Sequence, residues 1–129
     1  MAPPIERASV AVLLDRGRVL VQIRNKDKGI RVGLPGGRAD PGENAVQTMC
    51  RELYEEAGLV ADEWAPFFAG PDGNKLTTAF LVTRWHGQLR NSTEGVMAWA
   101  DPEVLLGEMA RFRDWNIRMM RALRSTLSG

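Results

Sequence analysis

Runs and alternations of hydrophobic residues predict the first strands of this chain. Ile5–Leu14 is rich in Val, Leu and Ala, which is typical of a buried strand. Arg18–Arg24 alternates, with Val19, Val21 and Ile23 on one face and the remaining side chains on the other. An Asp-Arg-Gly turn separates the two runs, so we expect them to form a hairpin.

Three later segments are predicted to be strands. Two short ones are Trp64–Phe68 and Val96–Ala100; the third, Leu76–Trp85, is a longer strand rich in β-branched and aromatic residues. Asn25–Val32 is polar with one glycine and is predicted to be a loop. Gly70–Gly73, with the sequence GPDG, is predicted to be a turn.

A helix is predicted from near Asn44 to Ala57, with Gly58 as its C-terminal cap. One side of this helix is apolar. Its residues are Val46, Cys50, Leu53 and Ala57, with Met49 at the edge. The opposite side is polar. It holds Thr48, Arg51, Glu52 and Glu55, with Glu56 flanking them. One face of this helix is therefore expected to pack, while the other carries charge.

Two helices are predicted near the C-terminus. Asp101 and Pro102 mark the start of the first, because Asp caps helices and Pro suits the first helical position. Its apolar residues are Val104, Leu105 and Met109. Asp114 is predicted to cap the second helix. The apolar side of that helix holds Ile117, Met120, Leu123 and Leu127. The whole pattern predicts one mixed α/β (α+β) domain over residues 1–129.

The central helix carries a charge pattern that does not favour its own stability. Glu52, Glu55 and Glu56 stand at positions i, i+3 and i+4, so they share one face and repel one another. They also lie in the later half of the helix, where the helix dipole does not stabilise carboxylates. This arrangement predicts a positive partner, and a divalent metal ion is the obvious candidate.

Composition narrows the classes of function. The chain has 129 residues with 17 basic and 16 acidic side chains, a net charge of +1 that argues against general binding to nucleic acid or membrane surfaces. No apolar run approaches the roughly 20 residues of a membrane helix. The first residues lack the pattern of a signal peptide, so we expect a cytoplasmic protein. With one cysteine, Cys50, and one histidine, His86, neither an internal disulfide nor a thiolate or histidine-rich zinc site is expected.

The residue types around the glutamates predict metal-dependent phosphate chemistry. Mg²⁺ and Mn²⁺ prefer carboxylate oxygens, and Mg²⁺ usually completes its shell with water and substrate phosphate. The pair Gly36-Gly37 allows the backbone to approach such a site closely. A metal there would neutralise a pyrophosphate and lower the pKa of a water molecule. A spare glutamate could take the proton from that water.

The central stretch resembles the Nudix box, GX5EX7REUXEEXGU, where U is a bulky aliphatic residue. Gly37, Glu43 and the segment Arg51–Leu59 fill every fixed position of this pattern. The sequence LPGG precedes it, and the flanking segments are also similar to the family. The resemblance implies an α/β/α sandwich with a mixed β-sheet between helices. It further implies a hydrolase that uses Mg²⁺ or Mn²⁺ to cleave a nucleoside diphosphate linked to another group.

The resemblance also implies roles for individual residues. By position, Glu55 and Glu56 correspond to the principal metal ligands, and Glu52 to a further ligand or to the base for water. Arg51 is expected to orient the carboxylates by pairing with Glu43 or Glu55.

Further ligands and substrate-binding residues are expected outside the helix. The carbonyl of Gly36 and the carboxylate of Glu94 are candidate metal ligands. The candidate substrate-binding residues are Arg24, Gly37, Arg38 and Asn116. The family suggests that Asn116 contacts a purine edge, although it could equally be a polar residue of the first helical turn. Arg24 could equally be a surface charge.

The sequence indicates the type of reaction but leaves several substrates open. We expect a small-molecule nucleotide, foremost a nucleoside triphosphate, oxidised or otherwise non-standard, cut to the monophosphate and pyrophosphate. The alternatives are ADP-ribose, a nucleotide sugar, a dinucleoside polyphosphate or a capped RNA. A rival of another class is a nucleotide-sensing protein on the same fold. We expect a monomer or homodimer without nucleic-acid or membrane partners.

Overall fold

The computed structural model describes residues 5–26 and 29–129, which form seven strands, two α-helices and one 3₁₀ helix. In chain order the elements are β1 (Glu6–Asp15), β2 (Arg18–Lys26), β3 (Gly29–Gly33), β4 (Gly36–Arg38), α1 (Ala45–Ala57), β5 (Leu59–Asp72), β6 (Lys75–Gly87), β7 (Val96–Ala100), η1 (Pro102–Leu106) and α2 (Arg113–Ser128). None of the helices in these residues is both long and apolar enough to cross a membrane.

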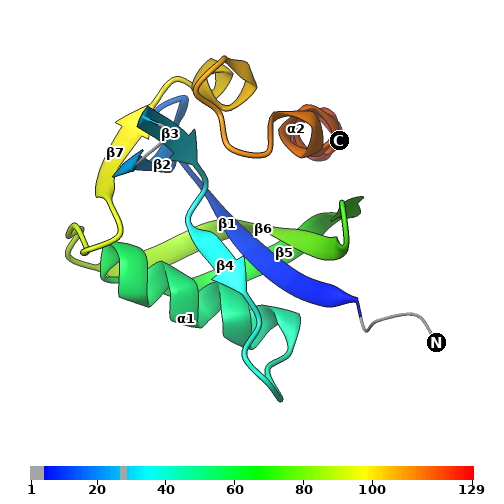
Figure 1. Ribbon diagram of the computed structural model, residues 1–129, viewed down its shortest axis with the longest axis horizontal. Coiled ribbons are helices and arrows are strands. Elements are labelled where there is room, and N and C mark those ends of the chain that lie inside the picture. The colour runs from blue at the N-terminus through cyan, green and yellow to red at the C-terminus, as the bar shows by residue number, and fades with distance from the viewer. Residues whose placement is uncertain (1–4, 27–28) are drawn as a thin grey trace.

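The strands form a mixed sheet with the order β3-β2-β1-β6-β5. β1 and β6 run parallel, whereas the other pairs are antiparallel. β4 also pairs with β1, and β7 pairs with β2. α1 packs against β1, β4 and β5, while α2 packs against β5 and η1 on the other side of the sheet (Figure 1). The predicted mixed sheet between helices is therefore confirmed.

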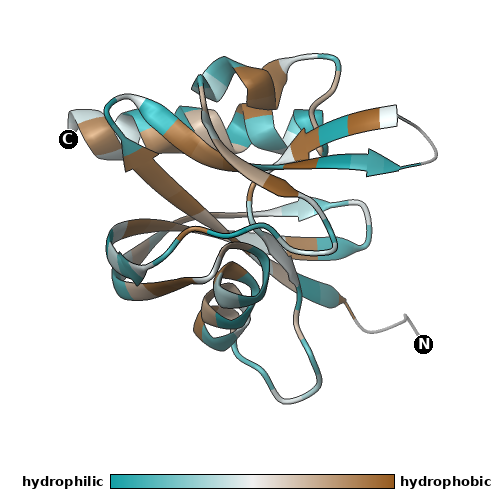
Figure 2. Ribbon diagram, turned by 90° about the vertical axis from the view of Figure 1, so that its left-hand side faces the viewer, coloured by the Kyte–Doolittle hydropathy of each residue, from teal (hydrophilic) through white to brown (hydrophobic). Residues whose placement is uncertain are grey.

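Two hydrophobic cores lie on the two faces of this sheet. Along β1, Ala11 and Leu13 belong to the core under α1, while Val12 between them belongs to the core under α2. β2 divides in the same way, with Leu20 on one side and Val19 and Val21 on the other. Hydrophobic segments accordingly line the central strands between the two helices (Figure 2). Because both faces are covered, the first strand needs apolar residues at consecutive positions.

The predicted bounds of the central helix are confirmed. Asn44 caps α1, since its side chain accepts a hydrogen bond from the Gln47 backbone while the Gln47 side chain accepts one from the Asn44 backbone. This reciprocal pair is a capping box. Gly58 ends the helix in the left-handed conformation, with φ 75°. A residue with a Cβ atom is disfavoured there.

The prediction of a loop at Asn25–Val32 is wrong for most of its length. β2 continues to Lys26 and pairs with β3 over Gly29–Gly33, while residues 27–28 lie outside the described residues. Gly36–Arg38, where the hydrophobic pattern predicts no strand, pairs with β1 as β4. Backbone pairing along a sheet edge does not require hydrophobic side chains, so the hydrophobic pattern missed both strands.

The fifth strand is much longer than predicted. β5 spans Leu59–Asp72 instead of Trp64–Phe68, and most of the predicted GPDG turn belongs to it, the turn itself lying at residues 73–74. Pairing with β6 shifts register at three places along β5. Such bulges break the alternation of buried and exposed side chains, which is why the pattern revealed only part of the strand.

The C-terminal helices also depart from the prediction. Asp101 does cap a helix, but that helix is the short 3₁₀ segment η1, and Met109 lies beyond its end. α2 begins at Arg113, and Asp114 lies in its first turn instead of capping it. The residue at the cap position is Phe112, which has a left-handed backbone. Leu127, predicted on the apolar side, is exposed because the last turn of α2 extends past the core.

Thr48, predicted on the polar face of the central helix, is buried instead. Its hydroxyl group remains satisfied because it donates to a carboxylate oxygen of Glu43 and also lies at hydrogen-bond distance from the Asn44 carbonyl. The loop before α1 therefore covers this part of the helix.

Candidate active site

Three carboxylates converge at one end of α1. Glu52 and Glu56 extend from the helix, and Glu94 comes from the turn before β7; one oxygen of each lies within 4.8 Å of the others. Glu52 and Glu56 are neighbours because they are four residues apart on one helix. Glu94 reaches them because β7 pairs with β2 in the register Ile23 to Val96. The three glutamates, each named from the sequence as a candidate metal ligand, thus lie in one cluster.

Glu56 is the most enclosed member of the cluster, with only 2% of its surface exposed. Its Oε1 accepts a hydrogen bond of 2.7 Å from the Gly36 backbone, which ties β4 to α1. Its Oε2 is buried and has no hydrogen-bond partner among the described residues. The pKa of Glu56 is raised to about 8, chiefly by burial and also by Glu52 and Glu94, while the hydrogen bond from Gly36 acts in the opposite direction.

The donor set fits a hard divalent cation. All three side chains offer carboxylate oxygens, which Mg²⁺ and Mn²⁺ prefer. A buried carboxylate oxygen without a hydrogen bond is costly, and the guanidinium group of Arg24, 3.6 Å from Glu56 Oε2, is too distant to donate one. A bound cation would satisfy this oxygen. Burial also raises the pKa of Glu52. In the protein alone, the negative charges of Glu52 and Glu56 are therefore not fully stabilised by their surroundings. Glu52, Glu56 and Glu94 are therefore the residues that would hold the metal.

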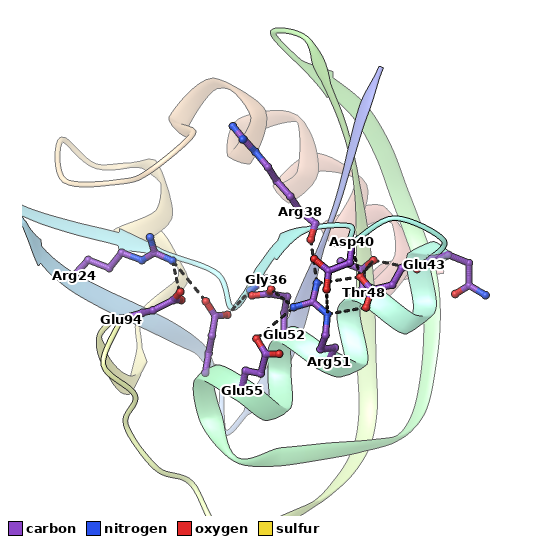
Figure 3. Close-up of polar contacts among 12 residues, drawn as sticks. Arg24, Gly36, Arg38, Asp40, Glu43, Thr48, Arg51, Glu52, Glu55 and Glu94 are labelled. Carbon is purple, nitrogen blue, oxygen red and sulfur yellow. Dashed lines mark hydrogen bonds and ion pairs between the residues drawn. The ribbon is translucent and has the colours of Figure 1, made fainter. Parts of the chain in front are cut away.

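Arg51 connects the loop before α1 with the carboxylates (Figure 3). Its guanidinium group donates to both oxygens of Glu43, at 2.6 and 2.9 Å, and to Glu52 Oε1 at 2.6 Å. A longer contact of 3.3 Å reaches Glu55, and another bond of 3.0 Å reaches the Arg38 carbonyl. The hydrogen bonds from Arg51 lower the pKa of Glu43 to about 2. The sequence leads us to expect that Arg51 pairs with Glu43 or Glu55. In the structure it contacts both of them and also pairs with Glu52.

Glu55 lies apart from the three-carboxylate cluster. Its side chain is 56% exposed, and its nearest charged partner is Arg51 at 3.3 Å. The expectation that it is a principal metal ligand stays a prediction, because the described residues bring Glu52, Glu56 and Glu94 together without it.

The glycine pair allows the close backbone approach that the sequence led us to expect. At Gly37, a Cβ atom would lie 2.7 Å from the carboxyl carbon of Glu52. At Gly36, it would collide with backbone atoms of β1. β4 therefore lies directly against Glu52 and β1: a Cβ at Gly36 would meet backbone atoms, whereas one at Gly37 would displace the Glu52 carboxylate.

A pocket of about 280 Å³ opens beside the carboxylates. The four residues predicted to bind substrate all line it: Arg24, Gly37, Arg38 and Asn116. The structure adds residues that the sequence reasoning missed: Lys75, Arg111 and Phe112. These residues come from β6 and from the start of α2. No local motif marked them, since only the fold brings these segments to the pocket.

Asn116 is a buried residue with a structural role. Its Nδ2 donates to the carbonyls of Leu105 and Arg111, at 2.9 and 2.8 Å, and so joins η1 to the start of α2. Both donors of the amide are therefore used within the protein. Only the acceptor, Oδ1, is left for a ligand in the pocket.

Gln22 is a further residue that the sequence reasoning missed. It is buried on β2, and its Oε1 accepts a hydrogen bond of 2.7 Å from Arg24 Nε. Arg24 in turn lies 3.4 Å from Glu94 and 3.6 Å from Glu56. The alternation of β2 places Gln22 and Arg24 on one face, which could have indicated this contact. Contacts with Gln22, Glu56 and Glu94 therefore fix the position of the Arg24 side chain, which is not an isolated surface charge.

Comparison with known proteins agrees with this geometry. The family model described as NUDIX domain matches residues 4–123. The chain belongs to the Nudix family. A MutT-like protein of Streptomyces ambofaciens is 30% identical over 127 residues, covering 95% of this chain and 80% of the relative. The Nudix fold is thus supported along nearly the whole sequence.

Two other comparisons are more limited. An 8-oxo-dGTP diphosphatase of Escherichia coli is 32% identical over 62 residues, covering 45% of this Nudix chain and 48% of that enzyme. The chain thus spans about half the length of this relative. A solved structure described as an ADP compounds hydrolase has a TM-score of 0.78 at 16% identity, covering 98% of this chain and 75% of the other. At that identity the similarity concerns the fold alone.

Proposed function

We propose that this Nudix protein hydrolyses a phosphoric anhydride bond of a nucleoside-diphosphate compound with the help of Mg²⁺ or Mn²⁺. The observation that carries the proposal is the cluster of three carboxylates, one of them buried with an oxygen that accepts no hydrogen bond, beside a pocket lined by cations. A bound divalent cation would neutralise phosphate charge and lower the pKa of a water molecule.

The residues of the chain divide the remaining work. Glu56 and Glu94 would hold the metal, while Gly36 fixes the orientation of Glu56 through its backbone N–H. Glu52 serves as a ligand or accepts the proton of the attacking water, a role that its raised pKa favours. Arg51 holds Glu52 in position by a hydrogen bond of 2.6 Å. Arg24 would pair with a substrate phosphate, which its position between the cluster and the pocket supports.

The leading substrate is a nucleoside triphosphate, oxidised or otherwise non-standard, cut to the monophosphate and pyrophosphate. Support comes from the partial similarity to an 8-oxo-dGTP diphosphatase and from the likeness to a MutT-like protein. Asn116 adds a constraint on the base, since the acceptor that it leaves for a ligand pairs with an N–H group of a base edge.

A substrate panel tests the proposal. It contains standard and oxidised nucleoside triphosphates, ADP-ribose, a nucleotide sugar, a dinucleoside polyphosphate and a capped RNA, each with Mg²⁺ or Mn²⁺. We expect metal-dependent release of pyrophosphate, or of a monophosphate, from at least one member. Glu56→Gln should abolish this release, whereas Glu63→Gln, an exposed glutamate of β5 that pairs with Arg84, should retain it.

The rival, a nucleotide sensor, gives a different result. A sensor would bind one member of the panel tightly without releasing phosphate from any of them. That outcome, obtained with wild-type protein and both metals, would reject the enzymatic proposal.

A further inference from the structure

Four cationic side chains line the pocket beside the carboxylates. They are Arg24, Arg38, Lys75 and Arg111, and Asp72 is the acidic residue that lines the pocket with them. Like charges gathered in a partly enclosed space repel one another, and burial adds to the cost of each charge. The pocket wall therefore favours a negatively charged ligand.

Among the four cations of the pocket, Arg111 has the fewest acidic partners. The other three each have acidic partners: Arg24 with Glu56 and Glu94, Arg38 with Glu6, and Lys75 with Asp72 at 3.9 Å. The guanidinium group of Arg111 makes no hydrogen bond or ion pair with the residues that the structure describes. Burial lowers the pKa of Arg111 and that of Lys75, which reflects the cost of keeping both charges in this wall.

Phe112 brings two of these cations together. Its ring lies 4.1 Å from Lys75 Nζ and 4.9 Å from Arg111 Cζ, both measured to the ring centroid. The negative face of an aromatic ring partly offsets such charges and so holds them near each other. Phe112 has a left-handed backbone, with φ 56°, and is 45% exposed at the pocket. A bulky residue in this conformation is strained, and such strain concentrates at ligand sites.

The start of α2 adds positive potential at the same wall. Phe112 occupies the cap position of this 16-residue helix and provides no side-chain cap for the first N–H groups. Arg111, Phe112, Trp115 and Asn116, which flank or form the first turn, all line the pocket. Free N–H groups and the helix dipole favour an anion there.

The pocket joins the carboxylate cluster to the turn between β5 and β6. Part of its wall is Gly36 and Arg24, which contact the carboxylate cluster. Another part is Lys75, which pairs with Asp72 beside that turn. Because the Phe112 ring contacts both Lys75 and Arg111, these two cations form a part of the wall distinct from the residues that hold the carboxylates.

We propose that Arg111 and Lys75, held against the ring of Phe112, form an anion-binding subsite for a substrate phosphate outside the diphosphate whose bond is cut. The identity of that diphosphate rests on the proposed function. The additional phosphate belongs either to the polyphosphate chain, as in a triphosphate, or to the sugar of a nucleotide. Arg111 binds it through two guanidinium N–H groups and Lys75 through its ammonium group.

Metal-free binding tests this subsite independently of catalysis. Dissociation constants are measured by NMR titration in EDTA for two pairs of probes that differ by one phosphate. The first pair is tripolyphosphate and pyrophosphate, and the second is adenosine 3′,5′-bisphosphate and adenosine 5′-monophosphate. The proteins are wild type, Arg111→Gln, Arg111→Lys, Lys75→Gln and the control Arg84→Gln, which changes an exposed arginine of β6 outside the pocket.

We expect wild type to bind the probe with the additional phosphate about tenfold more tightly in one pair. The pair that shows this increment identifies the polyphosphate or the sugar as the source. Arg111→Gln should lose the increment, Lys75→Gln should reduce it, and Arg111→Lys and Arg84→Gln should keep most of it.

Two results would overturn the proposal: no increment in either pair, or an equal loss of affinity for both members of a pair in Arg111→Gln. If the increment behaves as expected but the substrate panel shows no hydrolysis, the subsite stands and the proposed function fails.

Discussion

Replacing Glu56 by Gln should stabilise the metal-free protein at alkaline pH. Glu56 has a pKa of about 8 because it is buried among other carboxylates, whereas the unfolded chain has the ordinary value of 4.5. Between these values the unfolded chain releases the proton while the folded protein keeps it. The free energy of unfolding of the metal-free protein therefore falls as pH rises from about 5 to above 8.

The size of the effect follows from the pKa difference. A shift from 4.5 to about 8 corresponds to about 5 kcal/mol when the group is fully ionised, and we take this as an upper bound. Gln keeps an oxygen for the Gly36 N–H and cannot ionise. Near pH 5 the variant and wild type should be similarly stable, and at pH 9 the variant should be more stable by about 2–5 kcal/mol.

Urea unfolding in EDTA at pH 5, 6.5, 8 and 9 measures this difference. Glu55→Gln is the matched control, since Glu55 is the next residue on α1 and is exposed. Its stability should follow the pH dependence of wild type. Parallel loss of stability in wild type and Glu56→Gln, or a lower stability of Glu56→Gln throughout, would show that Glu56 is ionised in the metal-free protein and would refute the reasoning.

Three further changes have distinct expected outcomes. Gly36→Ala should lower the free energy of unfolding by about 2 kcal/mol or more, measured by urea unfolding, because its Cβ meets the backbone of β1. Gly37→Ala should leave stability nearly unchanged but lower kcat at least tenfold in the substrate assay, because its Cβ displaces the carboxylate of Glu52. Asn116→Ala should cost about 2 kcal/mol in thermal unfolding, since two buried carbonyls lose their donor. Unchanged kcat in Gly37→Ala, or unchanged stability in either other variant, would contradict these accounts.

The part of the site that lies within one continuous segment could be predicted from the sequence. Glu52 and Glu56 share a helical face because four residues separate them, and the caps of α1 follow from Asn44 and Gly58. The loop glycines were identified for the same reason, since close backbone approach depends on their own chemistry.

The rest of the site depends on pairing between distant segments. Glu94, which only the family resemblance suggested, joins the cluster through the register of β7 against β2, and Arg111 reaches the pocket through the path from η1 to α2. Neither position is specified by local propensity. The same reason explains the missed β3 and β4, which are defined by backbone pairing to neighbouring strands and not by their own side chains.

The repulsion among the three helical glutamates is compensated differently at each residue, and this shows where the cation is needed. Glu55 faces solvent beside Arg51, and Glu52 accepts a hydrogen bond of 2.6 Å from the same guanidinium group. Glu56 has neither solvent nor a hydrogen bond to its Oε2, and its raised pKa means that it keeps a proton near neutral pH. A divalent cation that replaced this proton would also offset the charge of Glu94, whose cationic partner in the protein is Arg24 at 3.4 Å. The helical spacing alone therefore predicts a cation, but the cluster that would hold it includes Glu94 from a second element and is not confined to the crowded face of one helix.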